Sequence, residues 1–209
     1  MLYDTAMRLC ALLLLAASAL GAADTLQVFR KTWHVVNASD WRVGDENGEQ
    51  VLTLATPREP LPGPRRPIQF AVTETPAYRS VKIEVDARPH QRSLMIVFAY
   101  RDPAHFDYAH LSIDTASKEP HHNGIFHVYG GERVRISNEA GPASFSETNR
   151  WYHVLLEWSG ATGEARVSVE GHEIPALHAV DLSLTSGRVG LGSFDETADF
   201  RNLKITGTE

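Results

Sequence analysis

The feature that most constrains the fold of this chain is a succession of short segments in which apolar and polar residues alternate. In residues 80–87, whose sequence is SVKIEVDA, valine or isoleucine occupies every second position and most of the others are charged. A period of two predicts a β-strand with one buried face, and no stretch sustains the 3.6-residue period of an amphipathic helix. Similar strands are expected at residues 94–100, 105–114, 125–129, 133–137, 151–158, 165–169, 188–193 and 200–205.

Turn-forming residues separate these segments, for example Asn123-Gly124, Gly130-Gly131 and Glu170-Gly171. Many short strands joined by such turns predict an all-β, antiparallel β-sandwich or jelly roll. Residues 94–100 (LMIVFAY) are almost continuously apolar, which predicts a strand covered on both faces. The proline-rich residues 57–67 are predicted to form a long surface loop, because proline lacks the amide donor that a strand or helix needs.

The N-terminal 23 residues have the pattern of a secretory signal peptide. Arg8 precedes an apolar run over residues 9–20, and small residues follow at the cleavage positions. The run is shorter than the roughly 20 apolar residues that span a bilayer, so we expect cleavage and no membrane span. Residues 24–209 are then a single secreted domain, periplasmic or extracellular.

Composition excludes several kinds of chemistry. The single cysteine, Cys10, lies in the signal segment, so the mature chain has neither disulfides nor thiolate sites. Acidic residues outnumber basic ones by 26 to 20, the net charge is −6, and no block of five like charges occurs. Nucleic acid is therefore a poor candidate for a partner. All ten histidines lie in the mature part.

The C-terminal half resembles the concanavalin A-like lectin/glucanase superfamily, and in particular its laminin-G-like and 3-keto-disaccharide hydrolase-type domains. The resemblance lies in residues 151–158 (WYHVLLEW), 166–171 (RVSVEG), 187–194 (GRVGLGSF) and 199–205 (DFRNLKI), in this order. It implies a concanavalin A-like jelly roll and a tendency to contact carbohydrate on the concave face. The E-x-D-x-x-E strand of the glucanase branch is not present, since Arg88-Pro89 follows Glu84 and Asp86.

Histidines and aromatic residues gather between residues 100 and 135. Strand alternation places Tyr108 and His110 on one face of their strand, and His127 and Tyr129 on one face of the next. If the strands are neighbours, we expect these side chains to converge on the concave surface. The predicted ligand-binding residues are Tyr100, Tyr108, His110, His127, Tyr129 and Arg135.

This cluster suits three uses. Rings that stack on sugars, with His and Arg binding hydroxyls and carboxylates, would make a binding cleft. A lyase or hydrolase would use a neutral His as base and a Tyr as proton donor, and the catalytic candidates are His110, His127, Tyr108 and Glu157. A metal site would need several converging ligands, and the candidates are His110, His122, His127 and Asp195. The alternative for each residue is an ordinary half-buried side chain.

The leading hypothesis is a secreted, lectin-like module that binds a polysaccharide or other glycan. The second is a polysaccharide-cleaving enzyme, a glycoside hydrolase or lyase, that uses a His/Tyr pair. The third is a structural or adhesion domain that binds another protein. Ca²⁺ as a structural ion is considered at Asp195, Glu196 and Asp199, because carboxylate oxygens are its preferred ligands. The sequence leaves the oligomeric state undefined.

Overall fold

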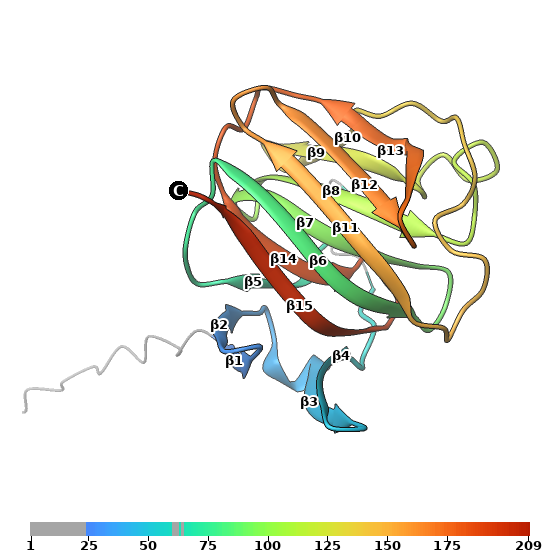
Figure 1. The fold of residues 1–209 in the computed structure, drawn as a ribbon. Helices are drawn as coiled ribbons and strands as arrows, with labels where there is room; N and C mark the ends of the chain where they lie inside the picture. The colour runs from blue at the N-terminus through green and yellow to red at the C-terminus, as the bar shows by residue number, and fades with distance from the viewer. Residues whose placement is uncertain (1–23, 60–62, 64) are drawn as a thin grey trace, which may run out of the picture.

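Two antiparallel β-sheets lie face to face in the computed structural model, which describes residues 24–59, 63 and 65–209 (Figure 1). The predicted signal segment lies outside these residues. The eight-stranded sheet has the order β1 (Thr25–Val28), β2 (Lys31–His34), β5 (Gln69–Thr73), β14 (Arg188–Ser193), β7 (Ser93–Asp102), β8 (His105–Ser112), β9 (Gly124–Tyr129) and β10 (Glu132–Arg135). The seven-stranded sheet has the order β13 (His172–Val180), β12 (Glu164–Val169), β11 (Tyr152–Ser159), β6 (Ser80–Pro89), β15 (Ala198–Thr208), β4 (Glu49–Leu54) and β3 (Trp41–Glu46). The predicted all-β jelly-roll sandwich is confirmed.

The main core lies between the sheets. It contains the inward residues of the alternating strands, among them Ile83 and Val85 of β6 and Leu156 of β11, all at most 1% exposed. Phe98 of the eight-stranded sheet packs on Trp158 of the other sheet, with ring centroids 5.8 Å apart. Burying each such side chain contributes roughly 1.5–3 kcal/mol, which makes this layer the main source of stability.

A second apolar cluster lies on the outer face of the eight-stranded sheet, the face turned away from the seven-stranded sheet. Its buried members are Phe70, Val72, Met95, Val97, Phe106, Tyr108, Phe126 and Val128. Strand β7 therefore has apolar side chains on both faces, as the continuous run at residues 94–100 predicted. The connection from β4 to β5 includes the proline-rich segment, and its described residues form no strand or helix.

The remaining strands have weaker sequence signals. Strand β13 contains Pro175, and it lies at the edge of its sheet, where a missing amide donor is tolerated. Strands β1 to β5 have four to six residues each and little regular alternation. Within the described ranges, no helix has the length and apolar character needed to cross a membrane.

Candidate functional site

A β-bulge in β7 places Tyr100 on the outer face of the eight-stranded sheet. The register between β14 and β7 shifts between Arg188 and Gly190, and Ala99 has a φ of 50°, an uncommon value for a residue other than glycine. The extra residue places the side chain of Tyr100 on the same face of the sheet as that of Val97. The backbone of Gly187 approaches closely here, since a Cβ on it would lie 2.1 Å from the carbonyl carbon of Ala99.

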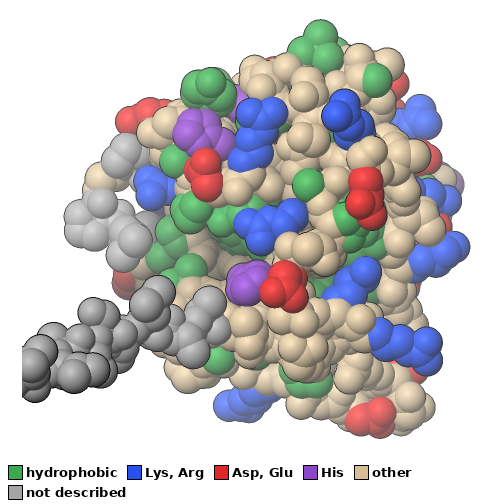
Figure 2. All heavy atoms as spheres, turned by 90° about the vertical axis from the view of Figure 1, so that its left-hand side faces the viewer, with side chains coloured by type: hydrophobic (Ala, Val, Ile, Leu, Met, Phe, Trp, Pro, Cys, Tyr) green, Lys and Arg blue, Asp and Glu red, His purple; other side chains and the backbone are tan. Residues whose placement is uncertain are grey.

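Tyr100 lines a cleft of about 710 Å³ on this outer face. Its ring packs against those of Phe70 and Phe106, with centroids 5.7 and 5.8 Å away, and the Arg188 guanidinium lies 5.1 Å from its centroid. Figure 2 shows hydrophobic side chains in a hollow with basic and histidine side chains nearby. The other lining residues are His34, Val35, Val36, Arg58, Glu59, Arg66, Pro67, Ile68, Val72 and Pro103. We call this the Tyr100 cleft.

A buried carboxylate, that of Asp40, holds the loop at the rim of the Tyr100 cleft against the sheet. Asp40 is 3% exposed and receives two hydrogen bonds from Arg58, from Nε at 2.5 Å and from Nη2 at 2.9 Å. Gln69 of β5 adds a bond from Nε2 to the same carboxylate and accepts the Arg58 amide at 2.6 Å. These bonds hold the loop that carries Arg58 and Glu59 beside the aromatic floor.

A second cleft on the same face, of about 270 Å³, surrounds His110. Its other lining residues are Arg65, Arg92, Glu119, His121, His122, Arg133, Phe194 and Asp195. Tyr108, whose ring centroid lies 6.2 Å from that of His110, is fully buried beneath the cleft, and its hydroxyl accepts a hydrogen bond from Arg133 at 3.3 Å. We call this the His110 cleft. Among the described residues, none lines both clefts.

Burial suppresses proton transfer by His110 and Tyr108. Loss of solvent lowers the pKa of His110 to about 3 and raises that of Tyr108 to about 12. The imidazole therefore stays neutral and the phenol stays protonated near neutral pH. The pair can accept and donate hydrogen bonds, but it is poorly suited to general acid–base catalysis.

The expected convergence of His127 and Tyr129 with Tyr108 and His110 is wrong. The register pairs Tyr108 with Phe126 and Asp107 with His127, so His127 and Tyr129 lie on the opposite face of the sheet from Tyr108. The imidazole of His127 is buried and Nδ1 lies 2.6 Å from Asp107 Oδ1, while the Tyr129 ring is exposed. Neither side chain reaches the outer face.

Arg135 lies on the outer face as expected, but its guanidinium is occupied. It donates hydrogen bonds to the carbonyl oxygens of Pro120 at 2.9 Å, His122 at 2.5 Å and Asn138 at 3.1 Å. It also covers Gly124, where a Cβ would lie 2.0 Å from Nη1. Arg135 thus holds the loop before β9 in place. Arg133, on the same face of β10, lines the His110 cleft together with Arg65 and Arg92.

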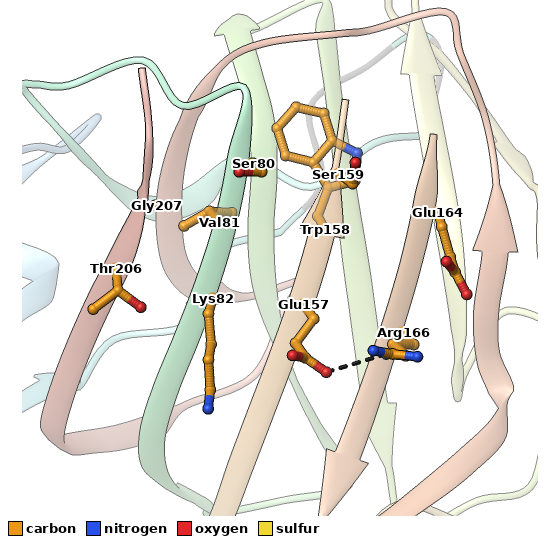
Figure 3. Close-up of a pocket in the computed structure, with 10 residues that line it drawn as sticks. All are labelled: Ser80, Val81, Lys82, Glu157, Trp158, Ser159, Glu164, Arg166, Thr206 and Gly207. Carbon is orange, nitrogen blue, oxygen red and sulfur yellow. Dashed lines mark hydrogen bonds and ion pairs between the residues drawn. The ribbon is translucent and has the colours of Figure 1, made fainter. Parts of the chain in front are cut away.

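Glu157 lies far from these groups, on the outer face of the seven-stranded sheet. Its carboxylate points towards Arg166 of the neighbouring strand and accepts a hydrogen bond from Nε at 3.1 Å (Figure 3). The catalytic candidates therefore occupy both outer faces and the interior between the sheets. They cannot act together on one substrate.

The expected metal sites are also dispersed. His127 lies across the sheet from His110 and His122, and arginines surround the latter two, which disfavours a cation. Asp195 pairs with Arg65, and Glu196 accepts hydrogen bonds from Ser93.

Asp199, the third carboxylate considered for Ca²⁺, accepts bonds from Thr53, Arg88 and His90. In the described part of the chain, one group of potential ligands lies within 4.8 Å, and it consists of Asp107, His127 and Asp181. An imidazole nitrogen with two carboxylates does not match the six to eight oxygen ligands of Ca²⁺. Asp107 and Asp181 were not among the residues predicted from the sequence.

Other residues of the Tyr100 cleft also escaped the sequence analysis. Phe70 and His34 come from the N-terminal strands that were poorly recognised, and Arg188 was assigned only to a predicted strand. The one local indication of the bulge in β7 is Gly187, just before the neighbouring strand β14, because a glycine at a strand often marks a close approach of another backbone. Tyr100 was predicted as a ligand-binding residue, but no sequence signal marked the bulge that turns its side chain to the outer face.

Comparison with known proteins shows the fold. No family model matches the chain, and no curated protein matches it. The carbohydrate-binding module CBM66 of Bacillus subtilis is similar in structure, with a TM-score of 0.60 and 17% identity, over 84% of this chain and 95% of that module. The GH43 protein BlXynB of Bacillus licheniformis has a TM-score of 0.53 and 16% identity, over 84% of this chain and 36% of that protein. These likenesses show the β-sandwich fold, and the concanavalin A-like superfamily and its laminin-G-like subtype stay predictions.

Proposed function

We propose that this protein is a glycan-binding module and that the Tyr100 cleft is its binding site. The observation that carries the proposal is the combination of an aromatic floor with a polar rim in one cleft. Phe70 and Tyr100 supply the rings, and Arg58, Glu59 and Arg188 surround them. A cleft that is mostly apolar with a few converging polar groups is the usual form of a small-ligand site.

The chemistry of a sugar matches this cleft. The axial and ring C–H groups of a pyranose form an apolar face that can stack on a tyrosine ring, while its hydroxyls lie at the edge. Arg188 covers part of the Tyr100 ring and Arg58 is held in place by Asp40, so both guanidinium groups are oriented before a ligand arrives. Groups held in position in this way lose little conformational entropy on binding. The carbohydrate-binding neighbour of the same fold supports the proposal.

Binding is favoured over cleavage. The His/Tyr pair considered for catalysis is buried, and the pKa values of His110 and Tyr108 are shifted away from neutrality in opposite directions. The Tyr100 cleft contains one carboxylate among its described lining residues, Glu59, whereas most glycoside hydrolases use a pair. A secreted location, which residues 1–23 predict, would bring the cleft to extracellular polysaccharide.

Affinity electrophoresis in gels that contain soluble polysaccharides tests the proposal. We expect a panel of β-glucan, xylan, galactomannan and fructan to include at least one polymer that retards the wild-type protein. Tyr100→Leu keeps apolar packing against Phe70 but removes the ring, and it should reduce retardation at least tenfold. Tyr129→Leu is the matched control, because Tyr129 is an exposed tyrosine on the opposite face of the same sheet.

Thermal unfolding of both variants shows whether the fold is intact. Retention that survives Tyr100→Leu, or that Tyr129→Leu abolishes, would contradict the proposed site. Absence of retardation by every polymer of the panel would contradict the function.

A further inference from the structure

We propose that the His110 cleft is a second and separate binding site, which takes a uronate, the acidic sugar residue of an acidic polysaccharide. It lies on the same outer face as the Tyr100 cleft but over β8, β9 and the ends of the adjoining loops. The two clefts share none of their described lining residues, so this proposal does not rest on the function assigned to the first.

The Nε2 atom of His110 is a hydrogen-bond acceptor to which no described group donates. Its side chain is 2% exposed, and Nδ1 donates a hydrogen bond to the carbonyl oxygen of His121 at 2.9 Å. Since Nδ1 carries the proton of the neutral ring, Nε2 presents a lone pair. Nε2 is buried, and no donor of the described chain lies within hydrogen-bond distance.

A buried acceptor without a partner is unfavourable, and native proteins contain few of them. Burial also lowers the pKa of the ring to about 3, which keeps this nitrogen unprotonated at physiological pH. The partner that Nε2 needs is therefore a hydrogen-bond donor. A sugar hydroxyl has this property.

Of the three arginines that line the cleft, Arg133 gives it its anion preference. Arg65 pairs with Asp195 at 3.1 Å and Arg92 with Glu196 at 3.2 Å, so both charges are largely compensated. Arg133 forms no ion pair with any described carboxylate, and its one side-chain hydrogen bond goes to the Tyr108 hydroxyl. Its charge is available to a ligand.

Aromatic rings hold the Arg133 guanidinium in place. It lies 4.7 Å from the ring centroid of Phe194 and 5.5 Å from that of Phe126. A planar guanidinium held between rings is pre-organised to bind a carboxylate through two parallel hydrogen bonds.

The two requirements select one kind of ligand. The cleft must receive a hydroxyl at His110 and an anionic group at Arg133, and its volume of about 270 Å³ suits a single sugar residue. A metal ion does not meet these requirements, because the uncompensated charge of Arg133 repels a cation. A uronate carries both groups on one ring.

Titration of the ¹⁵N-labelled protein, followed by NMR, tests the proposal with four probes. They are galacturonate, galactose, galactose 6-phosphate and acetate. We expect galacturonate to bind at least tenfold more tightly than galactose or acetate, and to shift the Nε2 resonance of His110 as a new donor reaches it. Tighter binding of galactose 6-phosphate would contradict the uronate assignment, and equal binding of acetate or galactose would contradict the need for both groups.

Three variants locate the site. Arg133→Gln should weaken galacturonate binding about 10- to 100-fold, as expected for the loss of a hydrogen-bonded charge pair. Arg101→Gln is the matched control, because Arg101 is exposed and lines neither cleft. His110→Phe replaces the acceptor with an apolar ring of similar size, and it should also weaken binding while the amide spectrum stays that of a folded protein.

Tyr100→Leu separates this proposal from the proposed function. It should leave galacturonate binding unchanged, whereas Arg133→Gln should leave retention by a neutral polysaccharide unchanged. Loss of galacturonate binding in Tyr100→Leu, or no binding of galacturonate by the wild type, would overturn the second site.

Discussion

Nδ1 of His127 lies 2.6 Å from Oδ1 of Asp107 on the inner side of the eight-stranded sheet. A second carboxylate, that of Asp181, is 3.1 Å from the same nitrogen, and its Oδ2 atom is buried without a hydrogen-bond partner in the described chain. The hydrogen bond to Asp107 favours the protonated imidazole and raises the pKa of His127 above its ordinary value. This histidine, once a candidate ligand residue, therefore belongs to an internal ion cluster.

We expect this cluster to stabilise the protein more at acidic pH than at alkaline pH. A raised pKa in the folded state contributes stability that is complete below the unfolded pKa of about 6.5 and is lost as the pH rises through the folded value. His127→Gln should lower the free energy of unfolding by about 1–3 kcal/mol near pH 5.5, and by less near pH 9. Urea denaturation at the two pH values measures the difference.

His153→Gln is the matched control for this prediction. His153 also contacts a carboxylate, with Nδ1 3.1 Å from Asp86 Oδ1, but it is an exposed residue on the outer face of the seven-stranded sheet. An exposed pair of this kind contributes about 0–1 kcal/mol. A His127→Gln effect that is independent of pH would contradict the charged state assigned to His127.

The fold was predictable because the alternation of apolar and polar residues is visible within each strand. The site depends in addition on the register in which neighbouring strands pair. Alternation fixed which residues of β8 share a face and which residues of β9 share a face. It could not decide whether Tyr108 pairs with Phe126 or with His127, and a shift of one residue moves every side chain to the other face. His127 and Tyr129, two of the six predicted ligand-binding residues, were therefore placed on the wrong side of the sheet.

Two residues of the outer face depend on irregularities that alternation does not reveal. Tyr100 reaches it through the bulge at Ala99, and Phe194 lies just beyond the end of β14 and reaches Arg133. Such features require contacts between segments distant in sequence. In the His110 cleft, His110 and His122 were both named from the sequence, but the arginines that line it were not recognised together.

Gly187→Ala should disrupt the bulge. The added Cβ would lie 2.1 Å from the carbonyl carbon of Ala99, so the two strands must separate or the bulge must shift. Overpacking of this kind costs about 1–3 kcal/mol. Because the bulge turns Tyr100 outward, we also expect weaker retention by the polysaccharide that binds the wild type.

Gly44→Ala provides the control for Gly187→Ala. Gly44 lies in β3, and a Cβ on it would meet no atom within 4 Å. The free energy of unfolding should change by no more than about 0.5 kcal/mol, with retention unaffected. Equal effects of the two substitutions would show that the close approach at Ala99 has no special role.

Asp199 should make the protein sensitive to acid. Burial alone would raise the pKa of this carboxyl, but hydrogen bonds from His90, Thr53 and Arg88 outweigh it and lower the pKa. The resulting stability is present above the unfolded pKa of about 3.9 and is lost as the pH falls through the lower folded value.

Asp199→Asn should therefore reduce the free energy of unfolding by about 1–3 kcal/mol at neutral pH, and by much less near pH 2. Denaturant titrations across this range measure the effect. Asp45→Asn is the control, since the exposed Asp45 accepts one hydrogen bond from the amide of Gly48 in a turn. A difference between wild type and Asp199→Asn that persists undiminished at acidic pH would contradict the lowered pKa.

Asp40→Asn should lower both the stability of the fold and the affinity for the ligand, because Asp40 holds the rim of the Tyr100 cleft in place. The substitution keeps the shape of the side chain but replaces one acceptor of the paired Arg58 hydrogen bonds with a donor. We expect a loss of about 1–3 kcal/mol in the free energy of unfolding, because Asp40 is buried. Affinity for the retained polysaccharide should fall severalfold, since Arg58 and Glu59 are no longer held beside the rings.

In a double-mutant cycle with Tyr100→Leu, the effect on affinity should be smaller than in the wild-type background, because both changes act on one cleft. Additive effects on affinity would show that the Asp40–Arg58 contact supports the fold alone.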